Sequence, residues 1–528
     1  MVRAVNRPLF ALSLIISGCW WLRASADPVP PAATPTPPSP PSGAAPTPEA
    51  APAAKKPHKP LVALVLPETR RVVGYERIKP YAAPDLTAET PPEPSEVKVV
   101  EITEPNEALV LARPYYPSPL LGAVVNGARA PVKGVVHAKT PRGCAPKLWY
   151  ALDPFGYVCA KGARPSSEPP TPDAVLKVPD GERLPFHYVM VYVKEGETIP
   201  MWATLEDARD GAEPERRLEK GDTVAVDHRA AVDGVPHWVS VEGKVFPTKG
   251  TGELQIVSAW QGEPLDDKTV FPFGWINPDQ AKVYAAPDVK QKPIETMARR
   301  TRVVIAEESG EGAKRMLRIA DGKWVRAADV NEVRKLARPP GITEAAQWID
   351  VDLGEQVLVA YEGDKPVFAT LTSSGRAIPT PRGNYPVWAK VSAISMKSQA
   401  YEDKAYFVNK VPWVLFFQAH NAIHGAYWHD RFGVTKSHGC VNVSPLDARH
   451  LFEWLKPVLP PGWTGYRSEN LLQSPTVHVR NSHAKVELVQ DRPIGPPDKE
   501  LEAQKMEEAE ERRAAAATVA PAATGMSP

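Results

Sequence analysis

Apolar and polar residues alternate in short runs over the C-terminal part of the chain, a pattern typical of half-buried β-strands. Residues 356–361 and 367–373 alternate in this way on either side of Gly363-Asp364, which predicts a β-hairpin that turns at this dipeptide. The apolar run Trp413–Phe417 is suited to a fully buried strand. This part of the chain is therefore expected to be rich in β-structure.

One helix is expected after these strands. Ser444-Pro-Leu-Asp447 has the form of a capping box with proline at the first helical position, and Pro457 follows a few residues later. The helix should run to about Leu455. The region 341–480 is therefore predicted to form one β-rich domain with one or two helices.

Between about Leu61 and Arg338 the apolar runs are short and are interrupted by Gly, Pro and Asp, which is typical of small all-β units. Ala281–Pro287 opens one such unit and Asp321–Val325 closes it, and weaker copies of the closing piece occur at 236–244 and 155–159. We divide this part into three β modules, at 61–175, 176–265 and 266–338.

The third of these modules resembles the bacterial SH3-like domain. The resemblance implies two or three small β-barrels in series, and such domains often bind peptides or cell-wall polymers. For Tyr284, Trp324 and Val325 individually, filling the barrel core is the expected role.

The N-terminus has the features of an export signal covering residues 1–26. Arg3 and Arg7 precede the apolar segment Leu9–Gly18, and Ala24-Ser-Ala26 offers a cleavage site. An alternative is a lipobox ending at Cys19, which would leave an acylated, lipid-anchored protein. Both alternatives predict export to the cell envelope, either periplasmic or lipid-anchored, with membrane contact only through that anchor.

Composition places linkers at both ends of the folded region. The segment 27–60 is rich in Pro and Ala, and 481–528 is a polar tail, so neither has enough large apolar residues to form a core. Lys plus Arg is 63 and Asp plus Glu is 62, a formal net charge of +1, so no nucleic-acid partner is expected.

The chain has only four cysteines. Removal or acylation of Cys19 leaves three, and in an oxidising envelope Cys144 and Cys159 are the natural disulfide pair, with two buried unpaired thiols as the alternative. Cys440 would then remain outside the disulfide.

Cys440 lies in Ser437-His-Gly-Cys-Val-Asn442, shortly after Ile423-His424-Gly425. A thiol with a pKa of about 8.5 needs an imidazole neighbour to act as a nucleophile near neutral pH. His424 and His438 can both supply one, and Gly439 leaves backbone N–H groups beside the thiol accessible to an oxyanion. The pattern predicts acyl transfer.

These residues resemble the motif of the L,D-transpeptidase (YkuD-like) catalytic domain, as do Ile349–Tyr361 and Thr380–Tyr385. The resemblance implies that Cys440 is the nucleophile and His424 the base, oriented by the Gly425 carbonyl. The implied oxyanion hole is formed by the backbone N–H groups of His438, Gly439 and Cys440. The residues assigned to substrate binding are Ser437, Trp428 and Asn442, of which Asn442 is also expected to bond backbone near the thiol.

Spacing alone leaves the base open. Twelve residues separate His424 from Ser437, whereas sixteen separate His420 from it. The sequence that follows His424 favours that residue, and His420 and His429 remain alternatives. A zinc site formed by the four histidines and Cys440 is disfavoured, because the chain has no second cysteine pair in this region, so neither a metal nor a cofactor is expected.

The resemblance implies a role in peptidoglycan biosynthesis and cell shape. Cys440 would attack the peptide bond after the third residue of a tetrapeptide stem, expel the terminal D-alanine, and pass the acyl group to the amine of a second stem as a 3→3 crosslink. An L,D-carboxypeptidase that uses water as acceptor and a catalytically silent wall-binding protein are the alternatives.

Overall fold

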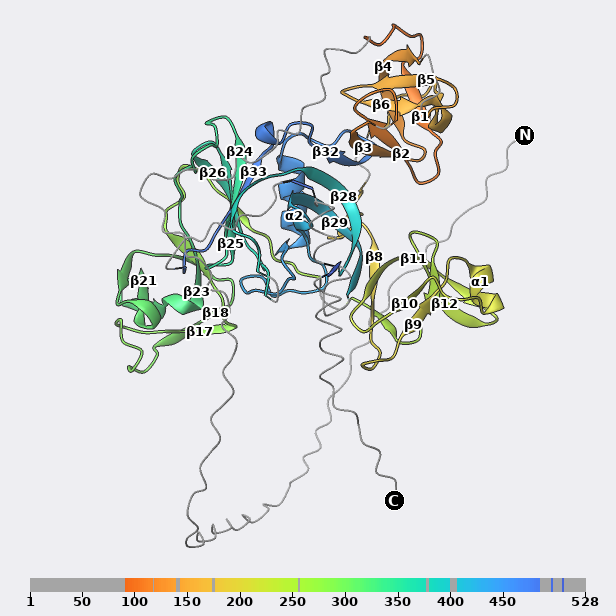
Figure 1. Cartoon of the computed structure of the whole chain (residues 1–528). Helices are drawn as coiled ribbons and strands as arrows, with labels where there is room; N and C mark the ends of the chain where they lie inside the picture. Colours follow the sequence, from red (N-terminus) through yellow and green to blue (C-terminus); the bar gives the residue numbers. More distant parts are fainter. Residues whose placement is uncertain are drawn as a thin grey trace, which may run out of the picture. The chain divides into compact units, whose positions relative to one another are not determined.

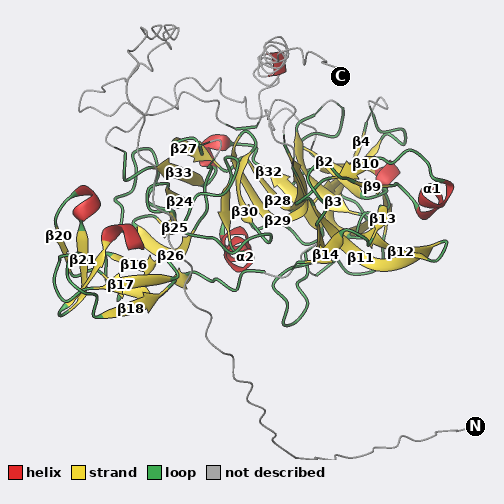
Figure 2. Cartoon of the chain, turned by 90° about the horizontal axis from the view of Figure 1, so that it is seen from below, coloured by secondary structure: helices red, strands yellow, loops and turns green. Residues whose placement is uncertain are grey.

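The computed structural model describes residues 91–484, with gaps at 117, 139–142, 173–175, 255–256, 377–378 and 399–405, together with 495–496 and 506–507. This part of the protein is mainly β, as expected, and its two α-helices are α1 (Leu205–Asp210) and α2 (Pro445–Trp454) (Figure 2). The predicted export signal, Cys19, the linker and most of the tail lie outside the described residues. Within the described residues, no helix has the length and apolar character needed to span a bilayer.

Module A comprises the strands between residues 99 and 165. They are β1 (Val99–Ile102), β2 (Glu107–Leu111), β3 (Leu120–Val125), β4 (Arg129–His137), β5 (Leu148–Leu152), β6 (Tyr157–Cys159) and β7 (Ala163–Pro165). Cys144 and Cys159 form a disulfide with an S–S distance of 2.08 Å. Strand β3 also pairs with β32 (Trp463–Arg467), and buried Trp463 packs in the core of module A. The module is thus joined to the C-terminal region by backbone hydrogen bonds and by one shared indole.

Module B comprises the strands between residues 187 and 253 together with α1. The strands are β8 (His187–Val191), β9 (Ile199–Met201), β10 (Arg216–Leu218), β11 (Thr223–Val232), β12 (Val235–Ser240), β13 (Val245–Pro247) and β14 (Thr251–Glu253). Tyr188 stacks on Tyr427 with 3.8 Å between ring centroids, and Phe407 joins the core of the module. Aromatic side chains again connect the module to the C-terminal region.

Module C follows, after β15 (Glu263–Pro264). Its strands are β16 (Phe273–Ile276), β17 (Gln280–Val283), β18 (Glu295–Ala298), β19 (Arg302–Val304), β20 (Glu307–Ser309), β21 (Met316–Ala320), β22 (Lys323–Arg326) and β23 (Val330–Val333). The opening and closing pieces singled out in the sequence meet, because Tyr284 and Trp324 exchange backbone hydrogen bonds of 2.8 Å. Trp324 and Val325 are buried, as expected for core residues. That modules A to C are separate SH3-like barrels stays a prediction.

The C-terminal region forms two sheets with a helix between them. Its remaining strands are β24 (Gln347–Asp352), β25 (Val357–Glu362), β26 (Lys365–Leu371), β27 (Gly383–Pro386), β28 (Ala389–Lys397), β29 (Phe407–Gln418), β30 (Asn421–Gly425), β31 (Val441–Val443) and β33 (Thr476–Arg480). One sheet has the order β15-β26-β25-β24-β33-β27. Strands β28, β29, β30 and β31 belong to the other and pair in that order. The predicted hairpin is β25–β26, and the predicted helix is α2, capped by the Ser444 hydroxyl.

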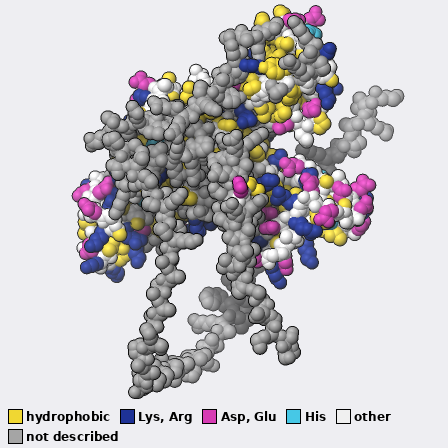
Figure 3. All heavy atoms as spheres, viewed as in Figure 1, with side chains coloured by type: hydrophobic (Ala, Val, Ile, Leu, Met, Phe, Trp, Pro, Cys, Tyr) yellow, Lys and Arg dark blue, Asp and Glu magenta, His cyan; other side chains and the backbone are white. Residues whose placement is uncertain are grey.

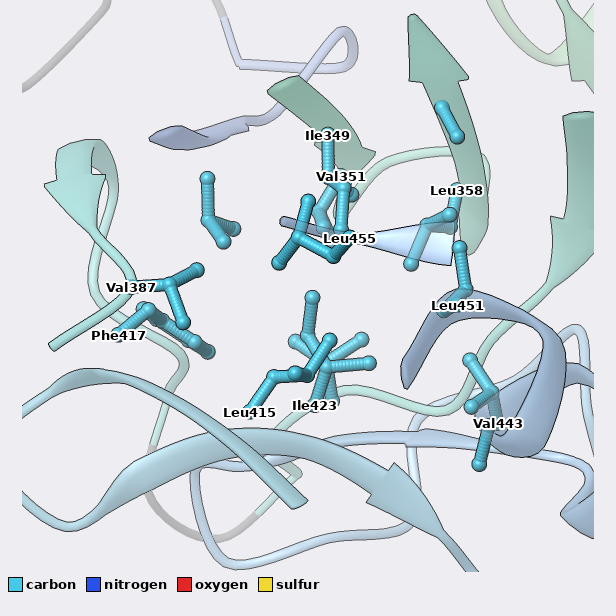
Figure 4. Packing of buried hydrophobic residues seen from close by; sticks show 14 of the residues in the cluster. Ile349, Val351, Leu358, Val387, Leu415, Phe417, Ile423, Val443, Leu451 and Leu455 are labelled. Atoms are coloured by element: carbon cyan, nitrogen blue, oxygen red, sulfur yellow. The ribbon is translucent and has the colours of Figure 1, made fainter. Parts of the chain in front are cut away.

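The core of this region is filled from both sheets and from α2 (Figure 4). Ile349 and Leu358 come from the first sheet, Leu415 and Ile423 from the second, and Leu451 from the helix, and each is no more than 1% exposed. Burial on this scale is what holds a β-rich domain together, since each such side chain contributes roughly 1.5–3 kcal/mol. It also anchors β30, the strand that carries His424.

Module C shares a second core with the C-terminal region. Phe273 and Trp275 of β16 pack with Trp348, Tyr361 and Phe432, and all five are at most 3% exposed. Figure 1 shows the strands of module C beside β24, β25 and β26. Because one apolar cluster contains side chains from both parts, module C and the C-terminal region should unfold together.

On the face drawn in Figure 3, Lys and Arg side chains are interspersed with Asp and Glu over the described modules. This distribution agrees with the formal net charge of +1.

The shared core gives a stability prediction. Replacing Trp275 by alanine should lower the free energy of unfolding by about 3–5 kcal/mol, because a buried indole is lost and a cavity is left. Module C and the C-terminal region should still melt in one transition, as measured by calorimetry. Val289→Ala, at a side chain on module C that is 49% exposed, is the control and should change little. A separate low-temperature transition for module C would contradict the shared core.

Candidate active site

The site is built on a parallel pair of short strands. Strands β30 and β31 are in register with His424 opposite Asn442 and Ile423 opposite Val441. Ile423 and Val441 point into the core, so His424 and Asn442 lie on the other face of the pair. Cys440 directly precedes β31, two residues before Asn442, and packs against the apolar cluster of Val411, Val414 and Ala422. Strand pairing therefore brings the thiol and the imidazole to one side of the sheet.

His424 is buried, only 2% exposed. Burial lowers the pKa of its imidazole from 6.5 to about 4, and the backbone of Gly425 opposes this in part. The side chain is therefore neutral at physiological pH and can accept a proton. Trp428, assigned to the substrate site, covers His424 with ring centroids 5.8 Å apart.

The loop before Cys440 is held by the segment that follows β26. Ser437 N–H donates to the Ser374 carbonyl at 3.0 Å, and Arg376 N–H donates to the Ser437 carbonyl at 2.9 Å. Thr380, from the predicted turn motif, donates its hydroxyl to the Gly439 carbonyl at 2.8 Å. Gly439 has φ +126°, a conformation that side chains with a Cβ rarely adopt. These bonds and the glycine fix the backbone just before the thiol.

Ser437 organises this turn through its hydroxyl. It donates to the Cys440 carbonyl at 2.5 Å and accepts from Gly439 N–H at 3.2 Å. Of the three backbone N–H groups expected to form an oxyanion hole, that of Gly439 is thus bonded to Ser437 in this structure. The assignment of Ser437 to substrate binding stays a prediction.

The other three histidines of this region make different contacts. His420 contributes its backbone carbonyl, 3.7 Å from Cys440 Sγ, and His438 stacks on Tyr406 with 5.0 Å between ring centroids. His429 lies with Nε2 3.0 Å from the side-chain amide of Asn442. His429 is half-buried. Local sequence carries no signal for this contact, which forms across thirteen positions.

Within the described ranges, no group of three or more His, Cys, Asp or Glu side chains is arranged to hold a metal ion. The described side chains offer a thiol and a neutral imidazole on one face of the same strand pair. Such an arrangement suits nucleophilic attack on a carbonyl followed by transfer of the acyl group.

The buried imidazole gives a pH prediction. The pKa of His424 is 6.5 in the unfolded chain and about 4 in the folded chain, so between these values the unfolded chain binds a proton that the folded chain does not. The free energy of unfolding should therefore fall as the pH is lowered from 6.5 to about 4. The fall in melting temperature between pH 7 and pH 4.5 should be smaller in His424→Gln than in the wild type.

The control is His187→Gln, at an exposed histidine of module B, which should retain the wild-type pH dependence. Equal pH dependence in the wild type and His424→Gln would show that His424 is not buried as a neutral ring.

Comparisons with known proteins bear on residues 346–473, which match the family model described as the L,D-transpeptidase catalytic domain, YkuD. No curated protein matches the chain. Among solved structures, a mutant of the Enterococcus faecium L,D-transpeptidase is 24% identical over 26% of this chain and 50% of its own, with a TM-score of 0.21. An L,D-transpeptidase from Stackebrandtia nassauensis is 24% identical over 26% of this chain and 57% of its own, with a TM-score of 0.19.

A third structure, an L,D-transpeptidase from Mycobacterium smegmatis, is 14% identical over 49% of this chain and 93% of its own, with a TM-score of 0.21. The chain spans about half the length of the Enterococcus faecium structure. The family match contains both the strand pair and the Ser437–Asn442 motif. Residues 346–473 of this chain are therefore similar to the YkuD L,D-transpeptidase catalytic domain.

Proposed function

We propose that this protein is an exported, cysteine-dependent L,D-transpeptidase that forms 3→3 crosslinks between peptidoglycan stem peptides. The observation that carries the proposal is the register of β30 and β31, which puts Cys440 and the neutral, buried His424 on one face of the sheet. Cys440 is partly exposed and outside the disulfide, so a substrate can reach its sulfur.

In the proposed reaction His424 accepts the thiol proton as Cys440 Sγ attacks the carbonyl carbon of the third stem residue. Backbone N–H groups near Cys440 stabilise the oxyanion that develops. The C–N bond to the terminal D-alanine then breaks, its nitrogen takes a proton from His424, and a thioester remains on Cys440. The amine of a second stem attacks the thioester, loses a proton, and leaves the new amide bond while the thiol reforms.

Three parts of the proposal concern the rest of the chain. Export to the periplasm or to a lipid-anchored position rests on the N-terminal sequence, and wall binding by modules A to C rests on their resemblance to SH3-like domains. The acceptor decides between transpeptidase and L,D-carboxypeptidase, because water can resolve the same thioester. If Cys440 were silent, the modules alone would supply the function as a wall-binding protein.

The nucleophile is tested by intact-protein mass spectrometry after incubation with a carbapenem. The wild type should gain the mass of one carbapenem, because an activated thiol opens the lactam ring, and Cys440→Ala should gain none. Val434→Ala, at an exposed side chain in the same loop, is the matched control and should be acylated like the wild type. Equal labelling of Cys440→Ala would remove Cys440 from the mechanism.

The base is tested by comparing two histidines. His424→Gln should slow acylation by roughly 10²–10⁴-fold, the usual contribution of a general base. His420→Gln should slow it far less, because the contact of His420 with the thiol uses the backbone carbonyl, which the substitution keeps. A larger loss in His420→Gln would transfer the role of base to His420.

The acceptor is tested by digesting purified tetrapeptide stems and analysing the products by mass. Crosslinked dimers support the transpeptidase, and tripeptides alone would show a carboxypeptidase.

A further inference from the structure

The loop that joins His424 to Cys440 is bonded to module C. Arg300, which follows β18, donates to both carboxylate oxygens of Asp430, at 2.6 and 3.2 Å. Arg299 donates to the carbonyls of Asp430 and Phe432, both at 3.0 Å, and Asn331 of β23 donates to the Gly433 carbonyl at 3.0 Å. Three residues of the loop, Asp430, Phe432 and Gly433, therefore accept hydrogen bonds from side chains of module C.

The Arg300–Asp430 pair is well placed to act as a fixed contact. The side chains are 19% and 30% exposed, and Ser258 donates to the same carboxylate. Burial alone raises the pKa of Asp430, but the hydrogen bonds from Arg300 and Ser258 outweigh it and lower the pKa below its ordinary value. Partly buried, bidentate Arg–carboxylate pairs are stronger than exposed ion pairs and fix the relative orientation of the two side chains more closely.

His429 immediately precedes this anchored stretch, and its two ring nitrogens have different partners. Arg431 N–H lies 3.2 Å from Nδ1 and can only donate, so Nδ1 accepts. Burial, together with Lys436 and His424, lowers the pKa of His429 to about 4, so the ring is neutral at physiological pH. A neutral ring whose Nδ1 accepts has its proton on Nε2.

The position of that proton determines how Asn442 is oriented. Nε2 lies 3.0 Å from the amide nitrogen Nδ2 of Asn442, and an N–H at this distance needs an acceptor. Two N–H donors cannot bond to each other, so we assign the amide of Asn442 in the reversed orientation, with its oxygen toward His429. Asn442 in turn lies opposite His424 in the β30–β31 register.

We propose that Arg300 is a positioning residue for the thiol site. By binding Asp430, it holds His429 in one orientation and one tautomer. His429 in turn fixes the side-chain amide of Asn442 beside His424. The proposal rests on the proposed function and extends it, since it gives module C a part in catalysis by the neighbouring domain. Arg300 and Asp430 act on the thiol site through His429, which directly precedes Asp430 in the chain.

The kinetic test measures the rate constant for acylation of Cys440 by a carbapenem in the full chain. Arg300→Gln and Asp430→Asn should each slow acylation about tenfold or more, since small displacements of catalytic groups are costly. The double variant should be no slower than the slower single variant, because both changes remove one interaction. Arg302→Gln is the matched control. This substitution breaks an ion pair of 2.7 Å between Arg302 of module C and Glu263, whose side chains are 35% and 30% exposed. The variant should be acylated within twofold of the wild-type rate.

The structural test records the ring-nitrogen NMR signals of ¹⁵N-histidine-labelled protein, with His429 assigned by its absence in His429→Gln. In the wild type His429 should have its proton on Nε2, and in Asp430→Asn it should become a mixture of tautomers. His429→Gln, which can still donate to Asn442, should retain more activity than His429→Phe. A purely structural role for Arg300 would lower the melting temperature without changing the tautomer.

The outcomes separate the two proposals. A wild type that is acylated, with Arg300→Gln and Asp430→Asn reacting within twofold of it, overturns the positioning role and leaves the proposed function intact. A wild type that is not acylated overturns the proposed function. In that case the tautomer of His429 still decides the positioning role, and a proton on Nδ1 contradicts it.

Discussion

The parallel pairing of β30 with β31 is the interaction on which the site depends. A parallel pair requires a long connection between its strands, and here that connection is the loop 426–440, which carries Trp428, His429 and the Ser437–Cys440 turn. A shift of the register by one residue would turn His424 into the core and leave Ile423 beside the thiol. The buried neighbours Ile423, Val441 and Val443 prevent that shift because they fit only the core face.

The long connection between β30 and β31 has to be held in place, and two other parts of the structure hold it. The segment after β26 holds the end of the loop next to the thiol, through Ser374, Arg376 and Thr380. Module C holds the middle, through Arg299, Arg300 and Asn331, and Phe432 packs in the core that the module shares with the catalytic domain. An upstream module whose sequence resembles an SH3-like domain can therefore also hold a loop of the candidate active site.

Structural elements that depend on neighbouring residues in the chain could be predicted from the sequence. Alternation around Gly363-Asp364 predicts the β25–β26 hairpin, and Ser444-Pro-Leu-Asp447 predicts the start of α2, because turn and capping residues act over three or four positions. The Ser437–Asn442 motif likewise identified the segment that the family model matches. The contact of Arg300 with Asp430 was not predictable, because it joins residues 130 positions apart and depends on how module C packs. The partners of His429 were missed for the same reason, since the register of two strands brings Asn442 to it.

The central claim is that strand register brings the sulfur of Cys440 within reach of the imidazole of His424. A crystal structure of the carbapenem-acylated protein tests it most directly, since the acyl carbon marks the reacting position. The account predicts an acyl group on Cys440 Sγ with the His424 ring as its nearest imidazole, at about hydrogen-bond distance or through one water. An adduct whose nearest imidazole is that of His420 or His438, with His424 turned away from the sulfur, would contradict it.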